Sequence, residues 1–365
     1  MTAATAIRAV TQEDLPDIVR LVNSCGFPAR SAEGWRWVLF GNPQQGDIPS
    51  GWVYEKAGSV TGFLGNFVNR YRCGSARYAI ATGHTVITDP VRGRQSGLKL
   101  IRHGMAQPDV DAFVTLNNNA LSAPLLPRVG ALPWLGPSGR EWAEWILRPS
   151  RAVRALLPSA GQAERFDCHP GFAFPVEGRR GGIMFVSLDD VGDDELAAIT
   201  ADDVLVRQID SVSLRYRLSD PDRRGGMSYV IARSGGRVLA LAGLLLTKPS
   251  PERLDHAEIV DWAGSACQAG VRAQQALLRH LVEIARRAGA SKLRLHFPSS
   301  VSAGVLRAAG PYLRRAHRHD PCHGHMRNGT LAGWQPGPGD ADYFFAYRIP
   351  PALFAAGEQP DDIMR

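Results

Sequence analysis

The chain has 365 residues, of which 44% are hydrophobic and 21% are charged, and its formal net charge is +7. This length and composition favour two globular domains with buried cores and exclude a chain that is disordered throughout. The longest apolar stretch, Val238 to Leu246, is too short to cross a bilayer, so we expect no contact with a membrane.

The N-terminus and the cysteines predict the cellular location. The first residues, MTAATAIRAV, have neither the charged start nor the long apolar run of a signal peptide. The five cysteines lie far apart and form no CxxC pair, which is typical of a protein from a reducing compartment. We therefore expect a cytoplasmic protein without a disulfide framework.

The positive charge does not by itself indicate a nucleic-acid-binding protein. Only four of the 42 basic residues are lysines, and the arginines are scattered rather than gathered on one predicted helix. The sequence shows no motif that combines aromatic and basic residues, so we expect no nucleic-acid partner. A basic surface would equally attract a phosphorylated small substrate.

The first half of the chain alternates helical and strand patterns. Apolar residues at helical spacing follow the capping residue Thr11. Turn-forming residues lie at the ends of the segments that we expect to be strands. In chain order we expect a helix over 11–23, a hairpin of strands 51–54 and 60–67 that turns at 56–58, a strand over 77–88, a helix over 98–105, a strand over 112–116, and a helix from the asparagines at 117–119 to about 130.

The second half repeats this order of elements. We expect strands over 228–231, 238–246 and 258–262, a helix over 273–288, a strand over 292–297, a helix over 301–309, and a last strand from Tyr343 to Arg348 that closes the sheet. Both halves therefore predict a mixed α/β fold, in which a partly antiparallel sheet is flanked by helices.

The repeat is also visible residue by residue. Arg36 matches Arg215 at a separation of 179 residues, Arg102-His103 matches Arg279-His280 at 177, and AVTQED at 9–14 is echoed by FVSLDD at 185–190. A separation of domain size indicates two copies of one fold. We place a first domain at 1–150, a linker rich in Pro, Gly, Ala and Arg at 151–180, a second domain at 181–350 and a tail at 351–365.

The sharpest motif of the first half lies between His84 and Ile101, where a strand turns through a basic, glycine-containing segment into a helix. The segment from Arg92 to Gly97 would place free backbone N–H groups, a helix N-terminus and two guanidinium groups at one point. That combination suits a pyrophosphate. A plain connection between a strand and a helix explains the same residues as well.

Together with the strand at 112–116 and the segment NNNALSAPLLPRVGALPW, this turn resembles the acyl-CoA signature of the GNAT acyltransferase superfamily. The signature is Arg or Gln, two residues, Gly, one residue, then Gly or Ala. Arg92 takes the first position and Gly97 the last, while Asn119 and Gly130 match a later segment. The resemblance covers about residues 7–135. WRWVLFGNP and its echo LRYRLSDP look like proteins with tandem GNAT domains, some of which acylate amino sugars on nucleotide carriers.

The resemblance implies an acyl-CoA cofactor, either acetyl-CoA or a longer acyl-CoA, whose pantetheine arm pairs with the strand like an added strand. Two positions depart from the family pattern. Gln95 stands where the signature has its middle glycine, and Leu126 stands where many members carry the tyrosine that protonates the leaving thiolate. The implied cofactor-binding residues are Val86, Thr88, Arg92, Gly93, Arg94, Gln95, Ser96, Gly97, Leu98 and Asn119.

The matching turn of the second copy, CQAGVRAQ, keeps Gly270 but has a single arginine, Arg272. We expect that this copy has kept the fold and lost most of its diphosphate binding, so that CoA binds the first domain only. Residues 1–150 alone would then bind CoA but transfer poorly, because the second domain would form one wall of the acceptor site.

A general base is needed if the acceptor is an amine, because an ammonium group cannot attack a thioester. Strand alternation places His84 on the strand face that leads to the turn, and histidine titrates near neutral pH. His84 is therefore the predicted catalytic residue. The alternative is a histidine that only forms a hydrogen bond within the sheet.

The segment HRHDPCHGHMRN near the C-terminus holds four histidines and Cys322. Thiol and imidazole groups are zinc ligands, but their spacing here matches no standard zinc pattern, so we expect no metal. A loop that contacts the substrate, through His323 and His325, and a solvated loop are the two other interpretations.

These patterns predict an acyl-CoA-dependent N-acyltransferase that transfers an acyl group directly to the amine of a small acceptor. The resemblance suggests a nucleotide-linked amino sugar, bound in the cleft between the domains. The alternative is a non-catalytic acyl-CoA-binding or ligand-binding protein built on two degenerate GNAT domains. The sequence does not indicate an oligomeric state.

Overall fold

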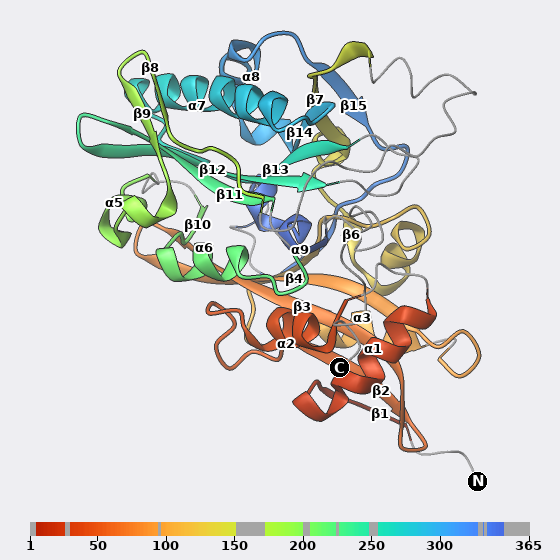
Figure 1. Cartoon of the computed structure of the whole chain (residues 1–365). Coiled ribbons are helices and arrows are strands. Elements are labelled where there is room, and N and C mark those ends of the chain that lie inside the picture. Colours follow the sequence, from red (N-terminus) through yellow and green to blue (C-terminus); the bar gives the residue numbers. More distant parts are fainter. Residues whose placement is uncertain are drawn as a thin grey trace.

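The computed structural model describes residues 5–25, 30–93, 96–150, 172–199, 205–223, 226–247, 255–327, 331 and 334–346. They form two mixed β-sheets that lie one above the other (Figure 1). In this view α7 and α8 lie above the second sheet, and α6 and α9 lie between the two sheets. Among the described residues, no helix has the length and apolar character needed to cross a bilayer.

The first sheet has the order β1-β2-β3-β4-β5-β16-β6, and β10 pairs with β3 beside it. Most of its strands come from the first half of the chain. Their bounds are β1 Thr5–Ala9, β2 Gly51–Lys56, β3 Ser59–Cys73, β4 Ala76–Thr88, β5 Ala112–Thr115, β6 Leu132–Pro133, β10 Val206–Arg207 and β16 His323–Met326.

The second sheet has the order β15-β7-β14-β13-β12-β11-β9-β8. Its strands come mostly from the second half. Their bounds are β7 Glu141–Ile146, β8 Gly178–Arg180, β9 Ile183–Val186, β11 Met227–Ser234, β12 Arg237–Thr247, β13 His256–Gly264, β14 Lys292–His296 and β15 Leu313–Ala316.

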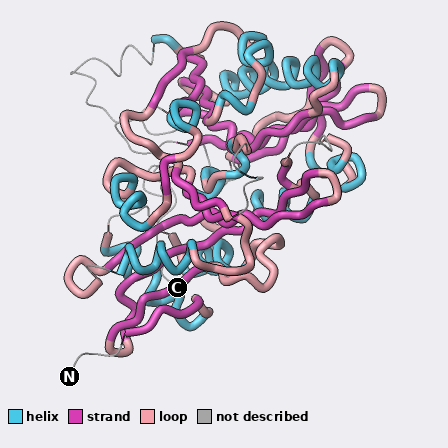
Figure 2. The backbone as a smooth tube through the Cα atoms, turned by 180° about the vertical axis from the view of Figure 1, so that it is seen from behind, coloured by secondary structure: helices cyan, strands magenta, loops and turns pink. Residues whose placement is uncertain are grey.

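Each sheet contains strands from the other half of the chain: besides β10 at the edge of β3, two strands are exchanged. β7 leaves the first half and inserts between β14 and β15, while β16 leaves the second half and inserts between β5 and β6. The two strand layers that result are seen from behind in Figure 2. Because the exchange is reciprocal and occurs at equivalent places, each sheet completes its backbone hydrogen bonds only with the other half present.

The α-helices and 3-10 helices (η) connect these strands. Their bounds are η1 Gln12–Asp14, α1 Leu15–Ser24, α2 Ala32–Phe40, α3 Ser96–Met105, η2 Ala123–Val129, η3 Gly136–Arg140, η4 Leu188–Asp190, α5 Asp193–Ala197, α6 Ser211–Leu218, α7 Gln268–Arg287, η5 Pro298–Ser300, α8 Ala303–Ala308, η7 Pro338–Asp340 and α9 Tyr343–Ala346.

Local sequence explains where the elements of the first half begin and turn. Ser31 caps α2, since its hydroxyl accepts a hydrogen bond from the Gly34 N–H at 2.9 Å. The hairpin of β2 and β3 turns at Ala57 and Gly58, whose φ angles of 52° and 74° suit the twist of a tight hairpin.

The predicted repeat is confirmed by equivalent contacts in the two halves. The capping box of η1, made by Thr11 and Asp14, recurs in η4 at Ser187 and Asp190. Trp37 of α2 stacks on Tyr216 of α6, 179 residues later, with ring centroids 4.6 Å apart. The Trp37 indole N–H donates to the Tyr216 carbonyl, and the Tyr216 hydroxyl donates to the Trp37 carbonyl, each at 3.2 Å. Such a reciprocal contact marks a local two-fold relation between the halves.

Three hydrophobic cores follow from the two-residue period of the strands. In β3, Phe63 and Phe67 face a central core between the sheets, which also holds buried residues of α1, α2, α6 and α9. Leu64 and Val68 of β3 face an outer core under α3. A third core lies between the second sheet and α7 with α8.

Two predicted elements differ from the structure. The predicted helix that ends near Gly130 is the 3-10 helix η2, because Pro127 lies inside it and a proline cannot donate the bond of an α-helix. The predicted strand from Tyr343 to Arg348 is wrong. Tyr343–Ala346 form α9, whose aromatic rings are buried in the central core, and 347–348 lie outside the described residues.

Strand exchange predicts that neither half folds alone. Residues 1–150 lack β16, so β5 and β6 would lose their common neighbour, and residues 151–365 lack β7 in the same way. We expect each fragment alone to show no cooperative thermal unfolding by circular dichroism, and the two co-expressed fragments to form one folded complex. This replaces the expectation that residues 1–150 bind CoA by themselves. A sharp unfolding transition in an isolated fragment would contradict the exchange.

Candidate active site

The site begins where two parallel strands separate. β4 pairs with β5 from Ile80 and Ala112 up to Thr82 and Val114, although β4 itself continues to Thr88. We call the point after Thr82 and Val114 the fork. Beyond it the edge of β4 turns toward a cavity rather than toward β5, and Gly83, His84, Thr85 and Val86 all line that cavity.

A β-bulge in β4 orients the residues at the fork. Phe63 opposes Ile87 and Gly65 opposes His84, so Leu64 of β3 faces two residues of β4. Thr85, one of the two, has a φ of 51°, in the left-handed region that non-glycine residues seldom adopt. A Cβ atom on Gly65 would lie 2.1 Å from the His84 ring. Glycine at 65 therefore allows the imidazole to pack flat against β3.

The cavity has a volume of about 290 Å³ and reaches from the fork toward three groups of elements. Val86, Ile101 of α3 and Leu126 of η2 form its wall on the side of the predicted cofactor turn. Val22 of α1 and Trp35 of α2 form the wall on the opposite side. The remaining wall comes from Asn117–Asn119 after β5 and from the chain at α9. One apolar space thus connects the predicted cofactor side with helices α1 and α2.

His84 is buried in this wall and is held by close neighbours. Its Nδ1 lies 3.0 Å from the Thr85 hydroxyl, and its ring meets the Phe345 ring edge-on at 5.0 Å. Burial, with a further contribution from the charge of Arg30, lowers the pKa of His84 to about 3. The imidazole is therefore neutral at pH 7.

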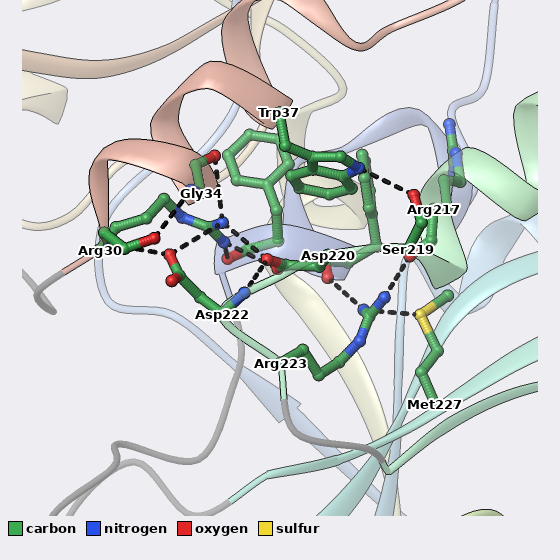
Figure 3. Close-up of polar contacts among 12 residues, drawn as sticks. Arg30, Gly34, Trp37, Arg217, Ser219, Asp220, Asp222, Arg223 and Met227 are labelled. Carbon is green, nitrogen blue, oxygen red and sulfur yellow. Dashed lines mark hydrogen bonds and ion pairs between the residues drawn. The ribbon is translucent and has the colours of Figure 1, made fainter. Parts of the chain in front are cut away.

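Arg30 is buried beside the cavity, and a set of acceptors satisfies its guanidinium (Figure 3). Its two terminal nitrogens donate to the two carboxylate oxygens of Asp220 at 2.8 and 2.9 Å, and one also donates to the Phe345 carbonyl at 3.0 Å. Burial raises the pKa of Asp220, but hydrogen bonds and charge from Arg30 hold it below its ordinary value. Arg30 thus joins the start of α2 to the loop after α6 and to α9.

In the turn after β4, several backbone N–H groups already form hydrogen bonds within the turn. The Asp89 carboxylate accepts from the Val91 and Arg92 N–H groups at 2.9 and 2.8 Å, and the Asp89 carbonyl accepts from Gly93 at 2.9 Å. The expectation of free N–H groups is therefore wrong at Arg92 and Gly93. The Arg92 side chain is exposed, and Arg94 and Gln95 lie outside the described residues.

Glycines in this turn permit close approach of backbone segments. A Cβ atom on Gly93 would lie 2.3 Å from the Thr61 carbonyl oxygen, and one on Gly97 would lie 3.2 Å from the Thr88 side chain. The start of α3 therefore packs against the end of β4 at Gly97, while Ser96 faces Gly62 of β3 and Leu98 packs on the outer core. The helix N-terminus lies beside the open strand edge.

The other predicted binding residues have structural roles of their own. The Asn119 side-chain oxygen accepts from the N–H groups of Leu121 and Ser122 at 3.0 and 2.9 Å, which starts the turn into η2. His323 and His325 belong to β16. Among the described residues, those that line the cavity do not include these two histidines. Their predicted contact with substrate stays a prediction. Within the described part of the chain, no three His, Cys, Asp or Glu side chains converge on a point that could hold a metal.

The structure adds polar residues to the cavity that the sequence did not indicate. Asp342, immediately before α9, lines it, and one carboxylate oxygen, Oδ1, is buried without a hydrogen-bond partner among the described residues. Burial raises the pKa of Asp342 to about 6, although a hydrogen bond with Asn117 acts in the opposite direction and lowers it. Trp35 also lines the cavity with a buried indole N–H that lacks a partner in the same described set. No local pattern marks either residue, because both reach the fork by tertiary packing.

The equivalent region of the second half is built differently. Only Ser265–Cys267 separate β13 from α7, and these three residues include no arginine. The Gln274 amide donates to the Ser265 carbonyl at 3.0 Å and fills the space beside Gly264. Asp261 opposes Gly243 as His84 opposes Gly65, but its carboxylate accepts hydrogen bonds from the guanidinium groups of Arg207 and Arg217.

The fold is similar to solved structures of acyltransferases. A probable N-acyltransferase from Enterococcus faecalis V583 gives a TM-score of 0.54 at 13% identity, over 90% of this chain and 74% of that one. GCN5-related N-acetyltransferases from Anabaena variabilis ATCC 29413 and Kribbella flavida give 0.53 and 0.52, each at 12% identity over 89% of this chain and over 73% and 71% of theirs. No family model matches the sequence, and no curated protein matches it significantly. The predicted fold, two GNAT-like domains in tandem, is confirmed.

The environment of His84 predicts a pH dependence of stability. Its pKa is about 3 in the folded protein against an ordinary 6.5, so the unfolded chain binds the extra proton between these values. This residue's share of the stability is therefore full above pH 6.5 and is lost as the pH falls toward 3. We expect the free energy of unfolding, measured by urea titration, to fall less in His84→Gln than in the wild type when the pH is lowered from 6.5 toward 3. A His84 imidazole NMR signal that titrates between pH 5.5 and 7.5 would contradict this.

Proposed function

We propose that the protein is an acyl-CoA-dependent N-acyltransferase with one active site, at the fork of the first half. The observation that carries the proposal is the continuous cavity that runs from the α3 side of the fork to the α1 and α2 side. A cofactor entering from one side and an acceptor from the other would meet beside His84. The GNAT fold supports the same arrangement.

The cofactor would bind along the open edge of β4. Between Val86 and Thr88 this edge is free of β5, so a pantetheine arm can add to it through backbone hydrogen bonds. The diphosphate would lie at the start of α3, where the helix N-terminus and the nearby Arg92 favour negative charge, and Arg94, two residues before the helix in the sequence, would add a second positive charge. Binding in the second half is not expected, because only three residues separate β13 from α7, and Arg272, the one arginine of the matching segment, lies within α7.

The reaction would be direct transfer. The amine nitrogen attacks the thioester carbonyl carbon, a C–N bond forms, the C–S bond breaks, and CoA leaves as the thiolate. Leu126 occupies the wall where the family tyrosine would stand, so the thiolate leaves unprotonated or takes its proton from another group. A base must remove a proton from the amine, and the fork offers two candidates, His84 and Asp342.

For the acceptor, the resemblance points to a nucleotide-linked amino sugar. The cavity supports the amine part of that proposal, because it is small and its wall includes the carboxylate of Asp342, which could accept a hydrogen bond from an ammonium group. Arg30 is the one cation among its lining residues in the described chain, and its guanidinium is already bonded to Asp220. Nucleotide phosphates would therefore bind outside the cavity, for example near the arginines of 314–327 in the second half.

Cofactor binding is tested by removing the charges of the first turn. Arg92→Ala with Arg94→Ala should weaken the binding of acetyl-CoA, measured by calorimetry, by about 1.5–3 kcal/mol for each lost charge-assisted contact. Arg272→Ala, at the exposed start of α7, is the matched control and should leave the affinity unchanged. Unchanged affinity in the folded double variant would reject the assignment. Binding of acyl-CoA without turnover of any amine would favour the non-catalytic alternative.

Acceptor choice is tested with amino sugars that carry or lack a nucleotide. If the second half binds the nucleotide, the linked sugar should have a lower KM than the free sugar and a similar kcat, because the nucleotide contacts lie away from the reacting amine. Thiol release from acetyl-CoA measures both constants. Equal KM values for the two forms would reject a nucleotide-linked acceptor and leave acyl transfer to a small amine in place.

A further inference from the structure

We propose that Asp342 is the general base of the transfer, and that it receives the proton of the acceptor ammonium group at the fork. This inference rests on the proposed function, since it assigns a residue to that reaction. His84, the base predicted from the sequence, would then be a neutral wall residue of the same cavity.

Contacts on both sides fix the position of Asp342. Two residues before it, the Asp340 carbonyl accepts a hydrogen bond from the Thr82 hydroxyl at 3.2 Å, and the Asp340 carboxylate accepts one from Tyr71 of β3 at 2.7 Å. One residue after it, the Tyr343 hydroxyl donates to the Leu116 carbonyl at 3.5 Å. Thr82 is the last residue of β4 that pairs with β5, and Leu116 directly follows the end of β5. Asp342 is therefore held directly over the fork.

The carboxylate lacks a partner on one side. Buried polar atoms in folded proteins nearly always form hydrogen bonds, and buried carboxylates nearly always have a charged or donor partner. Within the described residues, Oδ1 of Asp342 is buried and has none. An ammonium group entering the cavity would supply both the donor and the charge. The side chain thus has the properties of a binding group whose partner is the acceptor.

Burial acts in opposite directions on the two candidate bases. It raises the pKa of Asp342 to about 6 and lowers that of His84 to about 3. Asp342 is therefore roughly 10³-fold the stronger base and is still mostly ionised at pH 7. Other titratable and charged groups lie around α9. Arg223 donates to the Phe344 carbonyl at 3.1 Å, and the Arg217 guanidinium lies 4.5 Å from the centre of the Phe344 ring. The remaining groups are Arg30 with its partner Asp220, Asp340 with Tyr71 and Arg207, and His296, whose ring stacks on Tyr343 at 4.3 Å.

The ammonium gives one proton to the Asp342 carboxylate, and the low polarity of the cavity favours this neutral pair over the ion pair. The neutral amine attacks the thioester carbon, the C–N bond forms, and the C–S electron pair goes to sulfur. The proton still in excess on nitrogen passes to the thiolate, which gives CoA as the free thiol. Asp342 releases its proton to solvent after the amide leaves.

The test compares Asp342→Asn with His84→Gln in the full chain, with acetyl-CoA and glucosamine as the probes and thiol release as the readout. We expect Asp342→Asn to lower kcat by about 10²–10⁴-fold, with the acetyl-CoA KM unchanged, and to remove an acidic limb near pH 6. His84→Gln should keep that limb. Asp342→Glu, which keeps a carboxylate, should recover part of the rate, and Asp194→Asn, an exposed carboxylate in α5, is the matched control.

A readout without turnover separates this inference from the proposed function. Infrared difference spectra of wild type against Asp342→Asn should show a carboxyl group that titrates near pH 6, and calorimetry should give both proteins the same acetyl-CoA affinity. If the wild type transfers acyl groups while Asp342→Asn keeps its kcat and its acidic limb, Asp342 is not the base and the proposed function stands. If the wild type binds acetyl-CoA but acylates no amine, the proposed function fails and Asp342 has no transfer to catalyse.

Discussion

The reciprocal exchange of β7 and β16 is the constraint on which the rest of the structure depends. A buried strand must form hydrogen bonds on both edges, and β5 and β14 find their second neighbour only in the other half. The exchange also fixes the course of the chain after β16. That course carries η7 and α9 back between the sheets, so that a segment close to the C-terminus forms a wall of the first half's cavity.

Buried charge explains why the two halves differ in chemistry although they share a fold. A carboxylate inside the protein requires partners, and Asp261 has Arg207, Arg217 and the Tyr229 hydroxyl. Its oxygens are therefore committed to structure. At the first fork the equivalent residue, His84, is neutral, and the nearby Asp342 keeps an oxygen without a partner in the described chain. One half can thus serve as support while the other keeps polar groups open to a ligand.

The low polarity of the cavity has opposite effects on acids and bases. Burial disfavours the charged form of each group, so a histidine becomes a weaker base and a carboxylate becomes a stronger one. The sequence suggested His84 because histidine titrates near neutral pH in water. In the cavity, the same argument favours the carboxylate, provided that no arginine pairs with it. Arg30, which lines the cavity, is bonded to Asp220 instead.

The sequence by itself determined the features that depend on neighbouring residues. The Thr11 cap, the turn at Ala57 and Gly58, the strand–turn–helix segment from β4 to α3 and the domain-sized repeat were all predictable, because each is encoded within a short stretch or by its recurrence. Tertiary structure alone decided which sheet received β7 and β16, since a two-residue period shows that a strand is buried but not against which neighbour. It also made Tyr343–Ala346 a helix, because rings buried among elements of both halves outweigh strand propensity. Asp342 reached the fork for the same reason. Its partner Asn117, like Thr82 and Leu116, which bond its neighbours Asp340 and Tyr343, lies more than 200 residues away in the chain, and no local pattern records such a contact.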